Sequence, residues 1–427
     1  MKNSGLEWIG EIPDDWEVKR GKELFHEINE RCDNPENYPL LSVSEYYGVA
    51  PKSEKIEDGD FITHAETLEG YKICQKDDIV QNIMLAWKRA TGMSDYEGLI
   101  SPAYCIYRPF KQVESKYYHY LFRTKVYADL FKQYSTGIID SRLRLYPNKF
   151  LSLKYVYPPK EIQKKIVSYL DSKCSKIEET IQNQQQVIEK LKAYKQSLIT
   201  EAVTGKIKIQ NGKACGKYEK YKDSGVEWIG KIPSGWDVGK FGRFATVKSN
   251  LVDPNLYLDY PQIAPDNIEK SSGRLISYQS VRDSGVISWN HLFFKGQIIY
   301  SKIRPTLNKL IIAPFDGLCS ADMYPIETEL DKHFFVYMML SLYFVEQVGL
   351  ITRDRVKMPK INQNELSGIL ITVPSNEEQK NIAEYLDKKS LAIDNAIEQK
   401  QKLIEKLTEY KKSLIYECVT GKKEIKK

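Results

Sequence analysis

The sequence SGLEWIGEIPDDW at residues 4–16 returns as SGVEWIGKIPSGW at residues 224–236, which is 220 positions further along the chain. A second stretch also occurs twice, because residues 161–206 match residues 377–422 and both contain Tyr-Leu-Asp and end in Val-Thr-Gly-Lys. The two stretches mark the beginning and the end of one copy of a repeated plan. We therefore expect a fold built from two related halves.

The middle of each copy is less similar, but it has the same order of predicted elements. Short apolar runs separated by turns predict strands, followed by a helix over residues 115–134 in the first copy and 332–348 in the second. Gly137 and Gly349 are expected to end these helices. Further strands at 153–157 and 368–373 come just before prolines. We therefore expect mixed α/β domains at residues 1–158 and 223–374.

Long helices are predicted at residues 159–208 and 375–427, with a linker at 209–222 between the first helix and the second domain. Apolar residues spaced alternately three and four apart form a heptad seam, which is typical of paired helices. The seam residues are Ile177, Ile181, Ile188, Leu191 and Leu198 in the first helix and Ile393, Ile397, Ile404, Leu407 and Leu414 in the second. Polar residues interrupt the seam at matching levels, namely Gln184 and Lys400, then Lys195 and Lys411. These residues either are partly exposed or determine the register of the pairing.

The linker length favours antiparallel pairing of the two helices. A helix of about 40 residues is roughly 60 Å long. A linker of 14 residues spans only about 45–50 Å when fully extended, which is too short for a comfortable return along the helix. The predicted fold class is α+β, with two mixed α/β domains joined by an antiparallel coiled coil in a pseudo-two-fold symmetric arrangement.

Composition indicates an ordinary globular protein that is mildly basic. Lys and Arg number 63 against 57 Asp and Glu, a net charge of +6, which is compatible with nucleic acid without demanding it. The seven cysteines are scattered and form no Cys-x-x-Cys pair, which favours a reduced, cytoplasmic protein. We expect no membrane segment, because no apolar run approaches the roughly 18 residues needed to cross a bilayer.

The sequence lacks the common catalytic motifs. It has no P-loop, no Gly-x-Ser-x-Gly elbow, no zinc-ligand spacing among its histidines and no Asn/Asp-Pro-Pro-aromatic tetrapeptide of amino-methyltransferases. Its two Val-Thr-Gly-Lys stretches are typical of helix C-terminal caps. We therefore expect no catalytic residue, metal or cofactor in this chain.

The divergent middles carry cationic and amide side chains beside aromatic ones. Arg and Asn can read base edges, and Lys and Arg can also hold phosphates. The ordinary alternative for each residue is a solvated surface charge. The candidate DNA-binding residues are Trp87, Lys88, Arg89, Arg142, Arg144 and Lys149 in the first copy and Lys302, Arg304, Asn308, Lys309, Arg353, Arg355 and Lys357 in the second.

Together these motifs resemble the specificity (S) subunit of type I restriction–modification enzymes. The resemblance covers nearly the whole chain and rests on the repeated Trp-Ile-Gly-x-Ile-Pro segment and on five further stretches. These are LLSVSEYYGV (40–49), MLAW (84–87), YEGLISPAY (96–104), PPKEIQ (158–163) and EEQ (377–379). The second copy departs from the pattern, with Ser-Ala-Asp-Met at 320–323 and a single proline before its helix.

The resemblance implies a non-catalytic DNA-recognition role. Each globular domain would read one half of a split, asymmetric site in double-stranded DNA. The helices would set the spacing and dock two methyltransferase (M) subunits, which restriction/motor (R) subunits would join. Two other functions stay open from the residues alone: a nuclease or methyltransferase that carries its own target domains, and a coiled-coil adaptor that binds proteins.

Overall fold

The chain folds into two compact units in this computed structural model, which describes residues 1–32, 34–54, 68, 70–355 and 357–425. Unit 1 contains Met1–Asn183 and Lys402–Lys427, and unit 2 contains Gln184–Gln401. The long helices α5 (Lys160–Val203) and α11 (Asn376–Val419) each contribute to both units. Each unit therefore combines one globular domain with part of its own helix and part of the helix from the other copy.

Unit 1 is organised around a four-stranded antiparallel sheet in the order β4-β11-β8-β9. Its strands are β4 (Phe25–Ile28), β11 (Tyr104–Pro109), β8 (Ile79–Asn82) and β9 (Thr91–Met93). Four two-stranded sheets accompany it: β1 (Lys2–Asn3) with β2 (Glu11–Ile12), β3 (Glu17–Arg20) with β12 (Lys154–Tyr157), β5 (Leu41–Ser44) with β6 (Gly48–Pro51), and β7 (Lys72–Cys74) with β10 (Gly98–Ile100). The helices are α1 (Gly21–Leu24), α2 (Ser115–Phe122), α3 (Lys125–Gln133) and α4 (Pro147–Ser152), with 3-10 turns η1 (Pro35–Asn37), η2 (Lys52–Glu54), η3 (Ala86–Lys88) and η4 (Asp140–Arg142).

Unit 2 repeats the central sheet with the order β18-β26-β23-β24. These strands are β18 (Ala245–Val247), β26 (Met323–Thr328), β23 (Ile298–Ser301) and β24 (Leu310–Ile312). A five-stranded sheet is added, in the order β19 (Leu251–Val252), β22 (Asn290–Phe293), β25 (Gly317–Cys319), β20 (Pro261–Ile263) and β21 (Gln279–Ser280). The smaller pairs are β13 (Ile209–Gln210) with β14 (Lys213–Ala214), β15 (Tyr221–Asp223) with β16 (Lys231–Pro233), and β17 (Asp237–Lys240) with β27 (Leu370–Val373). Its helices are α6 (Phe241–Phe244), α7 (Val281–Ser284), α8 (Lys332–Leu340), α9 (Leu342–Thr352) and α10 (Gln363–Gly368), with 3-10 turns η5 (Pro254–Tyr257), η6 (Pro265–Asn267) and η7 (Pro305–Leu307).

The helix predicted over residues 115–134 is in fact two helices, α2 and α3, and its counterpart is also divided, into α8 and α9. Both single-helix predictions were therefore wrong. The hydroxyl of Thr124 accepts a hydrogen bond from the backbone of Tyr127 and starts α3, and the hydroxyl of Ser341 donates to the carbonyl of Met338 at the end of α8. Such side chains compete with the helical backbone for hydrogen bonds.

The other predictions for these segments had mixed outcomes. Gly349 lies inside α9 and does not end it, so that prediction was wrong too. The strands expected at 153–157 and 368–373 are confirmed as β12 and β27.

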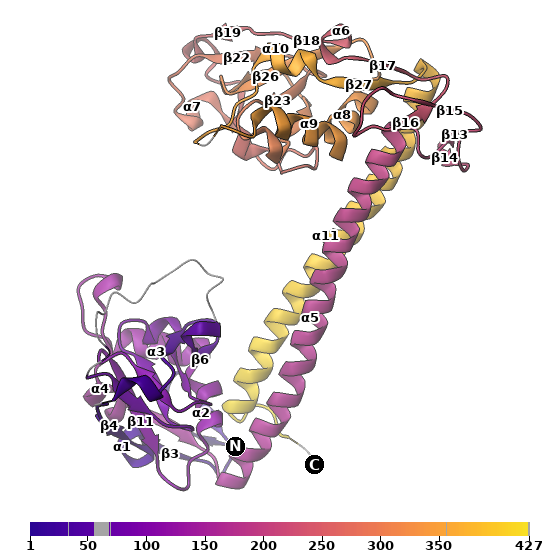
Figure 1. The fold of residues 1–427 in the computed structure, drawn as a ribbon. Coiled ribbons are helices and arrows are strands. Elements are labelled where there is room, and N and C mark those ends of the chain that lie inside the picture. Colours follow the sequence, from indigo (N-terminus) through magenta and orange to yellow (C-terminus); the bar gives the residue numbers. More distant parts are fainter. Residues whose placement is uncertain (33, 55–67, 69, 356, 426–427) are drawn as a thin grey trace. The chain divides into compact units, whose positions relative to one another are not determined.

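Helices α5 and α11 lie side by side (Figure 1) and are joined by polar side chains. In unit 2, the Lys195 ammonium lies 2.8 Å from Asp394, and Lys400 donates to the Gln184 side chain over 3.0 Å. In unit 1, Lys411 pairs with Glu178. Partner numbers fall along α11 as they rise along α5, so the predicted antiparallel pairing is confirmed. All ten predicted seam residues are buried or half-buried.

The repeated Trp-Ile-Gly-x-Ile-Pro segment packs against the end of the helix from the other copy. Gly421, just after α11, has a left-handed φ of +73°, and a Cβ there would lie 2.3 Å from Pro13 Cδ. Gly205, just after α5, has a φ of +70°, and its Cβ would lie 2.3 Å from Pro233 Cδ. Only glycine fits such a helix end. The same two turns thus close both units.

Both units have continuous apolar cores that include residues of α5 and α11. Helices α8 and α9 supply Phe334, Met338 and Phe344 to the core of unit 2. Within the described part of the chain, no helix taken singly has the length and apolar content to cross a membrane, and α8 with α9 passes that test only as a pair bent by 58°.

Candidate nucleic-acid interface

The turn between β8 and β9 presents the first group of candidate residues in unit 1. Trp87 is half-buried, and its indole N–H donates to the carbonyl of Met84 over 3.1 Å. The ammonium groups of Lys88 and Lys132 lie 5.3 and 4.7 Å from the centre of its ring, which is within cation–π range. Arg89 follows in a left-handed conformation, with φ of 70°. The turn therefore gathers positive charge around one aromatic ring.

The segment after α3 holds the second group of candidates. Arg142 lies in η4 and is exposed, and Arg144 forms a backbone bridge with Thr136. Lys149 is exposed on the short helix α4. This segment is joined to the β8–β9 turn, because the Leu145 amide donates to the Ile83 carbonyl over 2.9 Å. The structure thus brings together two groups that are more than fifty residues apart in sequence.

We call this contact between the turn and the segment after the helices the junction. Unit 2 contains the same junction with other side chains. The Ile361 amide donates to the Lys302 carbonyl over 3.0 Å, as Leu145 does to Ile83 in unit 1. Arg304 is exposed, and its amide donates to the Pro359 carbonyl over 2.7 Å. Arg353 and Lys357, in the segment after α9, are also exposed. In both units, therefore, the turn after the equivalent strand (β8 or β23) meets the segment that follows the helix pair.

Three of the candidate side chains in unit 2 form hydrogen bonds within the protein. Asn308 is fully buried, and its side-chain amide donates to the Met339 carbonyl over 2.9 Å, so its side chain is not part of the exposed set. Lys309 donates to the Pro265 carbonyl over 2.8 Å and lies 3.5 Å from Asp266. Arg355 binds Glu365, and these hydrogen bonds raise the pKa of Arg355 and lower the pKa of Glu365.

Some of the buried polar atoms without a hydrogen-bond partner among the described residues lie near these junctions. They include the side-chain amide nitrogen of Gln81 and the hydroxyl of Thr91 in unit 1, and Asn290 Nδ2, His291 Nδ1, Tyr300 Oη and Asn308 Oδ1 in unit 2. Burial, followed by the charge of Lys302, lowers the pKa of His291. A buried unpaired polar group costs about 1–3 kcal/mol, so both units carry polar strain next to the same junction.

Residues outside the predicted set also shape the junction in unit 1. Arg123 donates to the carbonyls of Arg89 at 2.7 Å and Tyr46 at 2.8 Å, and so holds the β8–β9 turn against the turn between β5 and β6. Lys132 contacts Trp87 from the last turn of α3. Nothing in the sequence linked Lys132 to Trp87.

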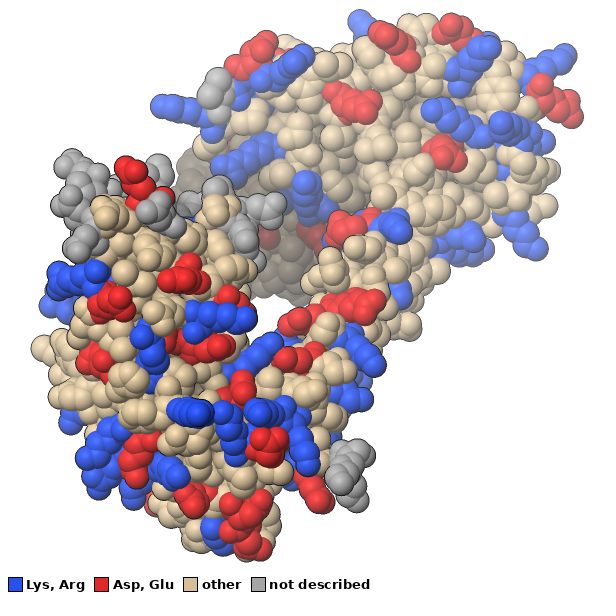
Figure 2. Space-filling model, turned by 60° about the horizontal axis from the view of Figure 1, so that its bottom comes forward, with Lys and Arg blue, Asp and Glu red and all other residues tan. Residues whose placement is uncertain are grey.

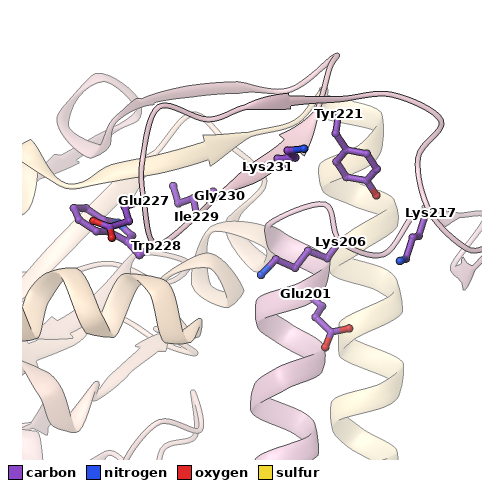
Figure 3. Close-up of a pocket in the computed structure, with 9 residues that line it drawn as sticks. All are labelled: Glu201, Lys206, Lys217, Tyr221, Glu227, Trp228, Ile229, Gly230 and Lys231. Atoms are coloured by element: carbon purple, nitrogen blue, oxygen red, sulfur yellow. The ribbon is translucent and has the colours of Figure 1, made fainter.

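On the face shown in Figure 2, charge is not concentrated in one field. Lys and Arg side chains alternate there with Asp and Glu side chains on both units (Figure 2). Figure 3 shows a shallow depression in unit 2, formed where the end of α5 meets the 217–231 segment and lined by Lys206, Lys217, Trp228 and Lys231 among others. None of its lining residues is a candidate DNA-binding residue.

Comparison with known proteins shows what the chain is similar to. Residues 233–409 match the family model of the type I restriction modification DNA specificity domain. The EcoDI specificity subunit of a type I restriction enzyme from Escherichia coli is 33% identical over 274 residues, which span 62% of this chain and 61% of that subunit. The putative MjaX specificity subunit from Methanocaldococcus jannaschii is 25% identical over 98% of this chain and 96% of that subunit.

Solved structures share the fold over the whole chain. A chain from a structural study of complex assembly in a type I R-M system superposes with a TM-score of 0.71, covering 96% of this chain and 98% of its own length at 13% identity. The HsdS subunit from Thermoanaerobacter tengcongensis superposes with a TM-score of 0.55, covering 99% of this chain and 100% of its own length at 14% identity.

Residues 233–409 are thus similar to the DNA specificity domain of type I restriction–modification systems. The matched relatives are specificity subunits of type I restriction enzymes, and the resemblance seen in the sequence is confirmed.

Proposed function

We propose that this chain reads a two-part, asymmetric DNA site, one part with each unit. Residues 1–158 and 223–374 would be the two target recognition domains, and residues 159–208 and 375–427 the spacer helices. One observation carries the proposal: the same backbone junction occurs in both units, closed by Leu145 on Ile83 and by Ile361 on Lys302, but it presents different side chains.

The exposed cations at each junction can contact both phosphates and base edges. Lys88, Arg142 and Lys149 are exposed in unit 1. Arg304, Arg353 and Lys357 are exposed in unit 2. Phosphate contacts hold a protein in position on a duplex, whereas contacts to base edges give sequence preference. Because the two sets differ, each unit would select its own sequence. Methyl transfer, ATP use and strand cleavage would belong to partner subunits.

The helices carry a repeated apolar surface that suits two copies of one partner. Val187 and Tyr194 are exposed on α5, seven residues apart, and Leu403 and Tyr410 are exposed at the matching positions of α11. Residues seven apart lie on the same face of a helix. Two equivalent exposed pairs on one chain fit two methyltransferase subunits, through which restriction subunits would join the complex.

Native mass spectrometry of the co-expressed complex tests this docking. We expect Tyr194→Asp or Tyr410→Asp each to reduce the number of bound methyltransferase subunits from two to one, because a buried unpaired carboxylate opposes the contact. Tyr46→Asp is the matched control, since Tyr46 is exposed but lies in the turn between β5 and β6. Two bound subunits in a chain that carries both Tyr194→Asp and Tyr410→Asp would contradict the assignment of this surface.

The methylome of a host that expresses this chain with its methyltransferase partner tests the reading of DNA. We expect methylation at one two-part motif, with a fixed gap between the parts. An unsplit motif, or methylation by the isolated chain without its partner, would contradict the proposal.

A further inference from the structure

Two adjacent isoleucines in unit 1 are exposed to solvent at the tip of the segment after α3. Ile138 is 98% exposed and Ile139 is 54% exposed. Neither belongs to the apolar clusters found among the described residues. A single exposed apolar residue is ordinary, but two neighbouring branched side chains held out from the fold are not explained by packing within the unit.

The tip is held in one conformation by its own backbone. Thr136 and Arg144 exchange two backbone hydrogen bonds, of 2.9 and 3.0 Å, at its base. The Arg142 amide donates to the Ile139 carbonyl over 2.8 Å. A Cβ on Gly137 would lie 2.5 Å from the Arg142 carbonyl oxygen, so the chain closes tightly on itself at that point. A tip that is already ordered loses little conformational entropy when it binds.

The charges around the tip are positive. Arg142, Arg144 and Lys149 follow it in sequence, and Arg142 and Lys149 are exposed. The nearby carboxylate of Asp140 is paired with Lys132 at 2.8 Å. An apolar tip among cations complements a surface that is anionic at its edges and carries apolar groups between them, which describes a groove of DNA.

We infer that Ile138 and Ile139 contact thymine methyl groups in the major groove of the half-site read by unit 1. The bridge between Thr136 and Arg144 makes the tip about as wide as a two-stranded ribbon, which the major groove admits, and the thymine methyl is the apolar group displayed there. The inference rests on the proposed function, and it adds a residue pair that selects thymine without a hydrogen bond.

The test uses the complex of the full chain with its methyltransferase partner and DNA that carries the two-part motif. Deoxyuridine replaces thymine in each half-site in turn, which removes only the methyl group. We expect the wild-type complex to lose about tenfold in affinity when the half-site of unit 1 is changed. We expect the Ile138→Ser/Ile139→Ser variant to bind thymine DNA about tenfold to a hundredfold more weakly and to bind both DNAs equally.

Ile287→Ser is the matched control, because Ile287 is 87% exposed and lies in unit 2; it should leave the discrimination at the half-site of unit 1 unchanged. Retained binding to random DNA at low salt shows that the double variant is folded. A wild-type complex that does not separate its motif from random DNA overturns the proposed function itself. Three outcomes overturn only this inference. The wild-type complex recognises its motif but binds equally well without the methyl groups, the half-site of unit 1 contains no thymine, or the double variant still discriminates between the two DNAs.

Discussion

The same junction is held by different side-chain hydrogen bonds in units 1 and 2. In unit 1, Arg123 at the end of α2 donates to the carbonyl of Arg89 over 2.7 Å. In unit 2, the direction is reversed, because Asn308 in the turn donates to the carbonyl of Met339 near the end of α8 over 2.9 Å. Arg89 and Asn308 both have left-handed φ angles, of 70° and 47°. The backbone position of the turn is therefore retained while the side chains that hold it have changed.

The contacts that join α2 and α8 to the long helices, which we call the frame, are instead identical in the two units. Gln163 and Gln379 each donate to the carbonyl of the proline at the foot of the long helix, over 2.7 and 2.9 Å. Tyr120 donates to Asp171 over 2.6 Å, and Tyr337 donates to Asp387 over 2.8 Å. The repeated Tyr-Leu-Asp and Gln motifs thus anchor α2 and α8 to their helices. The contrast teaches that the frame positions the junction and the junction is free to vary.

Among substitutions that test this difference between the units, we expect the largest loss of stability at Arg123. Its guanidinium also donates to the Glu45 carbonyl over 3.0 Å, and burial lowers its pKa to about 10, so it is still charged at neutral pH. Arg123→Ala would leave several carbonyls without a donor, and we expect unit 1 to lose about 3 kcal/mol of stability. Hydrogen exchange read separately in the two units measures the loss. Arg123→Lys keeps the charge but not the several N–H donors, so its loss of stability should lie between those of the wild type and Arg123→Ala. Unchanged hydrogen exchange in unit 1 of the Arg123→Ala variant would refute the role given to Arg123.

A second difference concerns acid sensitivity. His119 on α2 is half-buried, and its Nδ1 accepts a hydrogen bond from the Met93 amide over 3.2 Å. Burial, and then the charges of Arg123 and Lys116, lower the pKa of His119 from 6.5 to about 3. In the unfolded chain His119 binds a proton below about pH 6.5, whereas in folded unit 1 it does so only below about pH 3. The stability of unit 1 therefore falls as the pH drops from about 6.5 to about 3. The slope is about 1.4 kcal/mol per pH unit, or about 2 kcal/mol at pH 5.

Hydrogen exchange at pH 7 and pH 5, corrected for the intrinsic rate, measures this effect. His119→Gln removes the titrating group and should flatten the pH dependence of unit 1 while leaving that of unit 2 as it was. An equal pH dependence in the variant and the wild type would show that another group is responsible.

The smallest effect is expected in the polar pairs between the helices. The side chains of Lys195 and Asp394 in unit 2 are more buried than those of Lys411 and Glu178 in unit 1. We expect Lys195→Met to destabilise the helix pair by about 1 kcal/mol and Lys411→Met by a few tenths, since exposed pairs contribute little. Lys192→Met removes an exposed pair within α5 and serves as control. Thermal unfolding of the three variants ranks them, and a loss for Lys411→Met larger than that for Lys195→Met would reverse the expected order.

The frame could be predicted from the sequence because its signals are local or repeated. Heptad spacing and the helix-ending glycines identified α5 and α11, and the length of the linker indicated their direction. The break at Thr124 could not be predicted, because apolar spacing continues across it and the competing hydrogen bond leaves no mark on that spacing.

The junction was only partly predictable. Its cations stood out by composition, but Asn308 looks like a surface residue, and its burial depends on Met339, 31 residues away. The exposure of Ile138 and Ile139 could not be predicted either, since apolar side chains are expected inside. Contacts between segments distant in sequence decide both cases, and a local pattern does not contain them.

Binding selection on two DNA libraries tests the central claim that each unit reads its own half-site. Each library keeps one half of the motif and randomises the other, and the complex carries either Arg142→Ala/Arg144→Ala in unit 1 or Arg353→Ala/Lys357→Ala in unit 2. We predict that each variant relaxes selection in a single half, by about tenfold to a hundredfold per lost base contact, and that the two variants affect opposite halves. Relaxation of both halves by one variant, or of the same half by both, would contradict the division of the site between the two units.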